Sequence, residues 1–152
     1  MCFYCGCREI PLIADLIAEH EDVTDLGAAL TAALGAGDLD RARHLVREVA
    51  EKLRSHWLGE ETGLFDVMRA DEGYREYIDA LVREHRELRD LLAGADLEQP
   101  ADRARVVEAM EELYHHIAKE EDGLFPASLT ALSGEQWDRA MRAWAAAHPR
   151  VG

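Results

Sequence analysis

Long apolar runs are missing from the sequence, and their absence excludes several classes of protein. No stretch approaches the roughly 20 consecutive apolar residues that a membrane-spanning helix needs. The first residues lack the basic, apolar and cleavage regions of a secretion signal. Basic residues are also few, 17 against 31 acidic residues, which gives a net charge of −14. Because such an acidic surface repels phosphate groups, we expect neither nucleic acid nor a membrane as a partner.

Proline and cysteine are scarce as well. Only four prolines occur in 152 residues, and runs of β-branched residues are almost absent, so the composition favours helices. The three cysteines, Cys2, Cys5 and Cys7, crowd into the first seven residues. An odd, clustered set differs from the disulfide framework of a small secreted protein. We therefore expect a cytoplasmic protein with a Cys-rich lead at residues 1–9 and a single domain at residues 10–152.

Apolar residues recur every three or four positions in four long segments, and this spacing is typical of helices with one buried face. The segments cover about residues 11–35, 38–68, 74–94 and 102–126. Pro126 should end the last of them, because proline breaks a helix interior. Ser133 and Gln136 resemble a capping box and predict a short fifth helix at about residues 134–147. Long helices with short links predict an all-α, up-down-up-down four-helix bundle over residues 10–126, followed by this short C-terminal helix.

A ten-residue stretch occurs twice, once in the second predicted helix and once in the fourth. Residues 56–65 read HWLGEETGLF, and residues 116–125 read HIAKEEDGLF. Each copy begins with a histidine, and a glutamate follows four residues later on the same face of the helix. A further histidine precedes each copy, one in the apolar stripe of the first helix and one in that of the third. In an antiparallel bundle, the starts of the first and third helices meet the ends of the second and fourth.

Six potential metal ligands therefore converge on one level of the predicted core: His20, His56, Glu60, His85, His116 and Glu120. A purely structural polar core is the plainer interpretation, but buried carboxylates without compensating charge cost several kcal/mol, and a metal ion removes that cost. Four imidazoles and two carboxylates exceed the ligand set of one tetrahedral zinc ion, so they suit two divalent ions. Imidazole binds iron, zinc, copper and nickel, and carboxylate also admits manganese.

This arrangement resembles the hemerythrin-like family of HHE (histidine–histidine–glutamate) cation-binding domains over roughly residues 10–126. The resemblance implies a four-helix bundle with a non-haem centre of two iron ions, bridged by two carboxylates and an oxo or hydroxo group. Zinc and manganese remain alternatives to iron. Matched one at a time, the residues that correspond to terminal ligands are His20, His56, His85 and His116, and those that correspond to the bridges are Glu60 and Glu120.

The sequence departs from the family pattern at one position. Oxygen-carrying members have a second histidine on the third helix, four residues before the first, and that position is Leu81 here. Glu112 and Thr24 lie on suitable helix faces to replace the missing ligand or to support the others. Glu61 and Glu121, which follow the motif glutamates, are interpreted as solvated or as supports of the ligands. The missing ligand leaves two open metal ions, which favour redox turnover over reversible carriage of O2.

We therefore expect a di-iron protein that reacts with or binds the small molecules O2, H2O2 or NO in an oxidative or oxygen response. The alternative is a module that binds O2 reversibly, or senses iron or oxygen, without turnover. The sequence leaves undecided whether the protein is an enzyme with peroxidase-like or catalase-like activity. It also identifies no protein partner.

The Cys-x-x-Cys-x-Cys pattern of residues 2–7 is not part of the family pattern. As a zinc motif it is one ligand short, and its spacing matches no common zinc pattern. Three interpretations stay open for this lead. It is a reduced flexible tail, a thiol pair that senses oxidants or passes electrons, or a second metal site.

Overall fold

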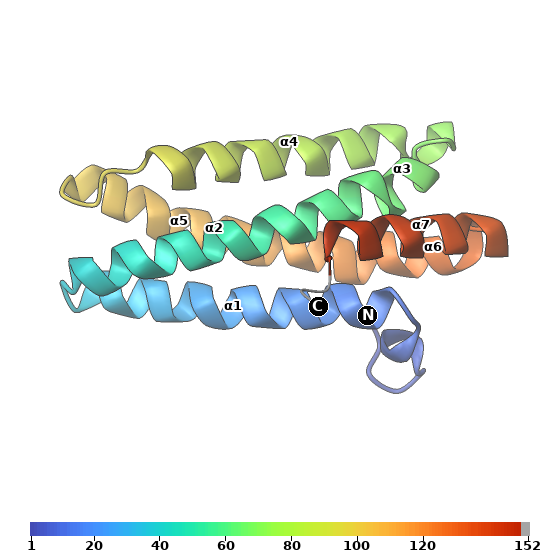
Figure 1. Ribbon diagram of the computed structural model, residues 1–152, viewed down its shortest axis with the longest axis horizontal. Helices are drawn as coiled ribbons and strands as arrows, with labels where there is room; N and C mark the ends of the chain where they lie inside the picture. The colour runs from blue at the N-terminus through green and yellow to red at the C-terminus, as the bar shows by residue number, and fades with distance from the viewer. Residues whose placement is uncertain (150–152) are drawn as a thin grey trace.

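The computed structural model describes residues 1–149, in which four long helices lie side by side (Figure 1). No β-strand occurs within this range, so the prediction of an all-α protein is confirmed. The long helices are α1 (Ile13–Gly35), α2 (Leu39–Thr62), α4 (Glu72–Gly94) and α5 (Pro100–Lys119). The shorter elements are η1 (Cys7–Glu9), α3 (Leu64–Met68), the π-helical turn η2 (Glu120–Leu124), α6 (Phe125–Ala131) and α7 (Gly134–Ala147).

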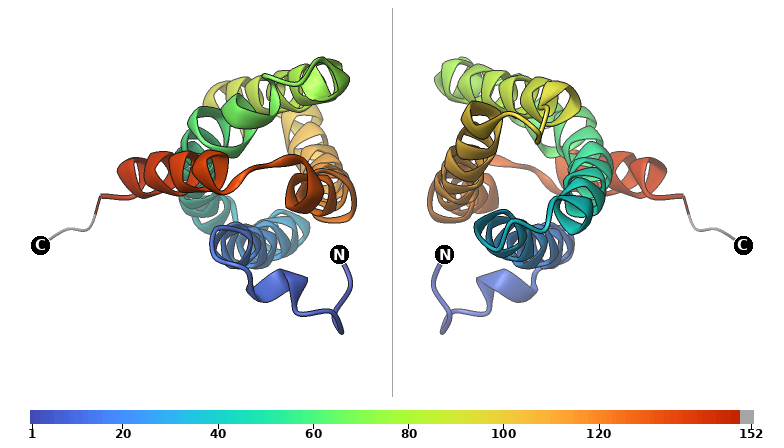
Figure 2. Two further views of the ribbon diagram at one scale, coloured as in Figure 1. Left: turned by 90° about the vertical axis from the view of Figure 1, so that its right-hand side faces the viewer. Right: turned by 90° about the vertical axis from the view of Figure 1, so that its left-hand side faces the viewer.

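Each long helix runs in the direction opposite to the previous one, as the colour gradient of Figure 1 shows. Contacts join α1 to α2, α2 to α4, α4 to α5, and α5 back to α1. The end-on views of Figure 2 show these helices around a common centre, with α7 outside them beside α2. The described part of the chain contains no helix that is both long and apolar enough to span a membrane.

The helix starts follow local signals in the sequence. Asp38 caps α2, because its side chain accepts a hydrogen bond from the backbone N–H of Arg41 at 3.1 Å. Ser133 and Gln136 form the predicted capping box, so the short C-terminal helix at residues 134–147 is confirmed. The first, third and fourth long helices begin within two residues of their predicted starts.

The helix ends in the repeated stretch differ from the prediction. In the first copy, α2 stops abruptly at Gly63, whose φ of −106° and ψ of −99° interrupt the helix before α3 begins. In the second copy, the prediction that Pro126 ends the helix is wrong, because the helical path continues to Ala131. The π-helical turn shifts the hydrogen-bond register, so Pro126 occupies the first turn of α6, where no backbone N–H is needed.

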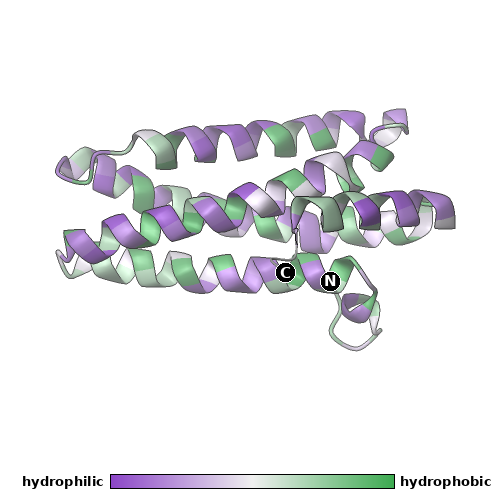
Figure 3. Ribbon diagram, in the orientation of Figure 1, coloured by the Kyte–Doolittle hydropathy of each residue, from purple (hydrophilic) through white to green (hydrophobic). Residues whose placement is uncertain are grey.

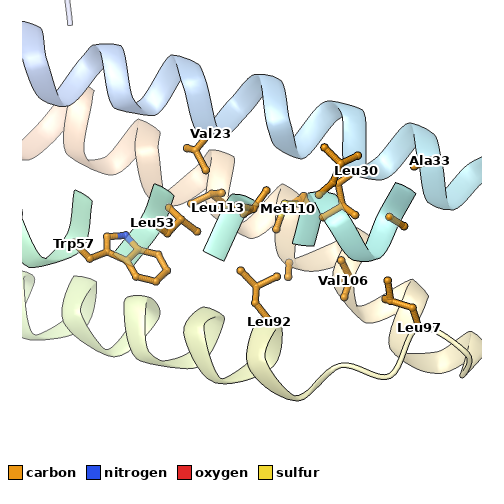
Figure 4. Close-up of a cluster of buried hydrophobic side chains, with 14 residues drawn as sticks. Val23, Leu30, Ala33, Leu53, Trp57, Leu92, Leu97, Val106, Met110 and Leu113 are labelled. Carbon is orange, nitrogen blue, oxygen red and sulfur yellow. The ribbon is translucent and has the colours of Figure 1, made fainter. Parts of the chain in front are cut away.

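Two hydrophobic clusters fill the core, one toward each end of the long helices. One contains Val23, Leu53 and Met110 (Figure 4), and the other contains Leu16 and Phe65. Polar and apolar residues are interspersed along the long helices (Figure 3). A buried polar layer lies between the two clusters, and it holds the residues that the repeated motif singles out.

Candidate metal centre

The six predicted ligands meet in this polar layer. They come from five elements: His20 from α1, His56 and Glu60 from α2, His85 from α4, His116 from α5, and Glu120 from η2. None of them exposes more than 5% of its surface. The antiparallel run of the helices therefore brings together all six residues that the spacing of the sequence predicts.

The imidazoles face each other in two pairs. Nε2 of His20 lies 3.1 Å from Nε2 of His56, and Nε2 of His85 lies 2.9 Å from Nε2 of His116. The ligand atoms of the first pair and of both motif glutamates all lie within 4.8 Å of one another. The ligand atoms of the second pair and of Glu120 meet the same limit. The layer thus contains two neighbouring groups of potential ligands that share a carboxylate.

Both motif carboxylates lie between the two imidazole pairs. Oε1 of Glu60 is 3.4 Å from Nε2 of His56, and its Oε2 is 3.6 Å from Nε2 of His85. Oε1 of Glu120 is 2.7 Å from Nε2 of His116 and 3.9 Å from Nε2 of His20. Each carboxylate therefore approaches one imidazole from each pair, as a bridging ligand must.

A carboxylate outside the layer fixes the orientation of every imidazole through its other ring nitrogen, Nδ1. The pairs are His20 with Glu121 (2.9 Å), His56 with Glu19 (2.8 Å), His85 with Glu61 (2.8 Å) and His116 with Glu84 (2.7 Å). A carboxylate only accepts hydrogen bonds, so each Nδ1 carries the proton. In the neutral imidazole, Nε2 then presents a lone pair to the centre, which is the form that binds a metal ion.

The polar layer fits a pair of cations. In each imidazole pair, two Nε2 atoms face each other across about 3 Å. In the neutral form each of them presents a lone pair, and a cation between them stabilises that arrangement. Within residues 1–149, none of the four oxygens of Glu60 and Glu120 makes a hydrogen bond, although all are buried. Buried carboxylates are normally hydrogen-bonded, paired or bound to metal. The donor set of imidazoles and carboxylates therefore has the chemistry of a site for two divalent ions.

The pKa values of Glu60 and His116 are shifted in the direction that adds protons, and so positive charge, to the buried layer. Burial and the neighbouring charge of Glu120 raise the pKa of Glu60 well above its ordinary value. Burial lowers the pKa of His116, but attraction to the Glu120 carboxylate and the hydrogen bond with Glu84 outweigh it and raise the pKa to about 10. Without a metal ion, the layer thus recruits protons to neutralise its carboxylates, and bound cations would take their place.

Aromatic rings hold two of the imidazoles from the side. The Trp57 ring stacks on His85 with centroids 4.6 Å apart, and Phe65 stacks on the same imidazole at 5.6 Å. Phe125 stacks on His20 at 5.8 Å. These rings restrict the rotation of the imidazoles and keep water away from the layer.

The sequence analysis missed the glutamates that orient two of the imidazoles, Glu19 and Glu84. It also missed the residues that bind the outer carboxylates. Lys119 bonds Glu84, Arg8 bonds Glu121 at 3.3 Å, and the indole N–H of Trp144 bonds Glu19 at 3.2 Å. One signal was available for the glutamates, because a Glu-His dipeptide precedes each copy of the repeat. No local signal identifies their outer partners, which come from distant parts of the chain.

The proposed substitutes for the missing histidine do not join the converging ligands in the described structure. Leu81 is buried in the apolar cluster that contains Leu16 and Phe65, with 1% exposure. Glu112 is exposed and binds Arg105 at 3.2 Å, and Thr24 is half-buried. Glu112 belongs to neither of the two groups of ligand atoms, and Thr24 borders the opening beside His20.

The cysteines of the lead lie outside the polar layer. Cys2 and Cys5 are exposed, Cys7 is half-buried, and all three are free thiols. The lead reaches the edge of the centre through Arg8, which binds the Glu121 carboxylate that orients His20. The three interpretations of the lead remain predictions.

Each imidazole pair lies beside a small opening. An opening of about 240 Å³ is bordered by His85, His116 and Trp57, and another of about 270 Å³ is bordered by His20 and Thr24. Each has room for several water-sized molecules. Each imidazole pair therefore borders a space that is large enough for a molecule the size of O2 or H2O2.

A comparison with models of known protein families finds one that matches residues 12–128, described as the hemerythrin HHE cation binding domain. The matched segment covers well over half of the chain and includes all six converging residues. No curated protein and no solved structure matches the chain.

Proposed function

Because the chain belongs to the hemerythrin family of HHE cation-binding domains, we propose that it is a non-haem di-iron protein that reacts with small oxidants. The proposed frame is an up-down-up-down four-helix bundle, which brings the ligands to one level. Iron is favoured over zinc by the resemblance to the family, and the predominance of imidazole over carboxylate disfavours manganese. The cytoplasmic location remains a prediction from the sequence.

The observation that supports the metal site best is the set of unsatisfied atoms at its centre. Four buried carboxylate oxygens lack hydrogen bonds, and the Nε2 atoms face each other in two close pairs. A folded protein retains such groups when a ligand satisfies them, because each would otherwise destabilise the fold. We assign His20 and His56 to one ion, His85 and His116 to the other, and Glu60 and Glu120 to both.

The bound iron pair would supply electrons for the reduction of O2, H2O2 or NO. The residues of this chain supply the remaining requirements. Glutamates on Nδ1 keep each imidazole in its metal-binding tautomer, and apolar clusters on both sides of the layer limit the entry of water. The openings beside the imidazole pairs are large enough for small oxidants.

The apolar residue at position 81 supports turnover rather than reversible O2 binding. Leu81 leaves the second imidazole pair without a third histidine, so both halves have the same number of imidazoles. An accessible position on each side allows an oxidant to reach either half. Reversible O2 binding or sensing without turnover is the second candidate function, supported by the burial of all six proposed ligands.

The test is the response of the iron-loaded protein to oxidants. The protein is reduced without air, and its visible spectrum is followed after separate additions of O2 and H2O2 while the remaining H2O2 is assayed. Catalytic loss of H2O2 supports the enzyme interpretation, whereas a spectral change that reverses when O2 is removed supports binding or sensing.

A matched pair of variants ties the response to the site. Glu60→Ala removes a proposed bridge, so the protein should bind fewer than two iron ions and lose both responses. Glu76→Ala removes an exposed glutamate that borders neither opening, and it should change neither the iron content nor the responses. If both variants bind iron and respond as the parent does, the assignment is wrong.

A further inference from the structure

α7 lies outside the segment that defines the family. The family match ends at residue 128, whereas α7 covers Gly134–Ala147 and packs against α2 and α3. Figure 2 shows it on the outer side of α2, away from the common centre of the long helices. Trp144 in its last turn and His148, which directly follows its last residue, nevertheless reach the metal centre through Glu19.

Glu19 joins α7 to His56. Its Oε2 accepts hydrogen bonds from Nδ1 of His56 at 2.8 Å and from the indole N–H of Trp144 at 3.2 Å. Its other oxygen contacts Nε2 of His148, which makes an ion pair when that imidazole is protonated. The Trp144 and His148 rings stack with centroids 4.2 Å apart, and Nδ1 of His148 bonds the carbonyl oxygen of Trp144 at 2.7 Å. The two side chains therefore form a unit that holds one carboxylate.

In the other half of the centre, which contains His85 and His116, a lysine binds the carboxylate that corresponds to Glu19. Glu84 orients His116 as Glu19 orients His56, and Lys119 binds Glu84. Lys119 occupies the fourth position of the second repeat, HIAKEEDGLF, and Gly59 occupies that position in the first, HWLGEETGLF. The first half thus lacks the lysine that the second half uses.

Glycine at position 59 also makes room for α7. A Cβ atom there would lie 2.9 Å from Cδ1 of Trp144, closer than side chains tolerate. A Cβ atom at Gly63 would lie 2.9 Å from the carbonyl oxygen of Ala140, also in α7. Glycine in place of lysine at this position of the first copy therefore has two effects. It leaves Glu19 without a lysine partner, and it gives α7 the space to pack there and supply Trp144 as a partner.

We propose that α7 is a positioning element for one half of the metal centre, in which Trp144 and His148 hold Glu19 and thereby the orientation and tautomer of His56. This inference rests on the proposed metal site. Outer partners of metal-binding histidines typically contribute 10- to 100-fold to metal affinity. Loss of both α7 side chains should therefore weaken one of two bound ions by roughly that factor and leave the other unchanged.

The test uses Co(II) as a probe, because its visible spectrum reports the ligand geometry and its retention against a competing chelator reports affinity. The parent chain should hold two ions. The double variant Trp144→Ala, His148→Ala should hold one ion as tightly as the parent and the other about 10- to 100-fold more weakly, with an altered spectrum. Arg139→Ala is the control for docking, because Arg139 anchors α7 to Asp66 at 2.9 Å without touching Glu19. It should leave both affinities unchanged.

A rescue variant separates positioning from general support of the fold. Adding Gly59→Lys to the double variant places a lysine where the second repeat has one, so the weakened ion should regain most of its affinity. Two ions held with parental affinity by the double variant would overturn the role of α7 and leave the proposed metal site standing. Equal weakening of both ions, or the absence of rescue, would also overturn it. A parent that binds no Co(II) would refute both proposals.

Discussion

Replacement of Glu60 by glutamine should stabilise the metal-free protein and remove its stabilisation by metal ions. Glu60 is 1% exposed, neither of its carboxylate oxygens makes a hydrogen bond within residues 1–149, and the charge of Glu120 lies beside it. Glutamine keeps the volume of the side chain, is uncharged without binding a proton as the buried Glu60 must, and offers an N–H group to Glu120. The same change removes a ligand that both proposed ions share.

The magnitudes follow from these contacts. A hydrogen bond to a charged group contributes about 1.5–3 kcal/mol, so the metal-free variant should gain about 2 kcal/mol in its free energy of unfolding. For a chain of this size, that gain raises the Tm by roughly 4–8 °C. In the parent, free metal at 100 times the Kd should add about 2.7 kcal/mol for each site. The variant should show little of this increase.

The assay is unfolding in urea, followed by circular dichroism, with a chelator and then with excess Fe(II) in the absence of air. Glu112→Gln serves as the control, because this side chain is exposed and its replacement should change stability by less than about 0.5 kcal/mol. The reasoning is refuted if the metal-free Glu60→Gln protein is less stable than the parent. It is equally refuted if the variant gains as much stability from iron as the parent does.

Three further predictions concern other parts of the molecule. Glu84→Gln should weaken one bound metal ion about 10- to 100-fold in a chelator competition, and an unchanged affinity would contradict its role. Gly63→Ala should lower the free energy of unfolding in urea by roughly 1–3 kcal/mol, because the new Cβ atom would lie 2.6 Å from a backbone oxygen. Gly94→Ala is the control and should not lower it, because its Cβ atom would meet no other atom within 4 Å. A hydrogen bond between the two thiols lowers the pKa of Cys5 and raises the pKa of Cys7. As the pH rises, iodoacetamide should therefore modify Cys5 before Cys7. Peptide mass mapping measures the two rates, and equal rates would contradict the prediction.

The convergence of the six central residues could be predicted because it depends on only two regularities. Residues four apart share a helix face, as His56 and Glu60 do, and an antiparallel arrangement places the start of one helix beside the end of the next. Both regularities are visible in the spacing of the sequence. The repeat strengthened the prediction, since the same two residue types recur 60 positions later.

The carboxylates around the imidazoles depend on geometry that spacing does not encode. Glu19 lies next to His20 in the sequence but binds His56 on another helix, and Glu84 likewise binds a histidine of α5. Which neighbour a glutamate reaches depends on how each helix is rotated about its axis. The docking of Trp144 onto Glu19 adds a contact between residues 125 positions apart, for which the sequence contains no local signal.

Local rules also failed where the surrounding structure changed the hydrogen-bond pattern. Proline usually ends a helix, but the π-helical turn before Pro126 places it in a first helical turn, where it is tolerated. The two copies of the repeat also differ in backbone structure although their sequences are similar. The first copy has a break in the helix at Gly63, and the second has the π-helical turn.

The most direct test of the central claim is an anomalous-scattering map from crystals of the iron-loaded protein, recorded at the iron absorption edge. The account predicts two peaks in the polar layer, one between Nε2 of His20 and His56 and one between Nε2 of His85 and His116, with Glu60 and Glu120 between them. A single peak, or iron bound elsewhere while the polar layer contains none, would contradict it.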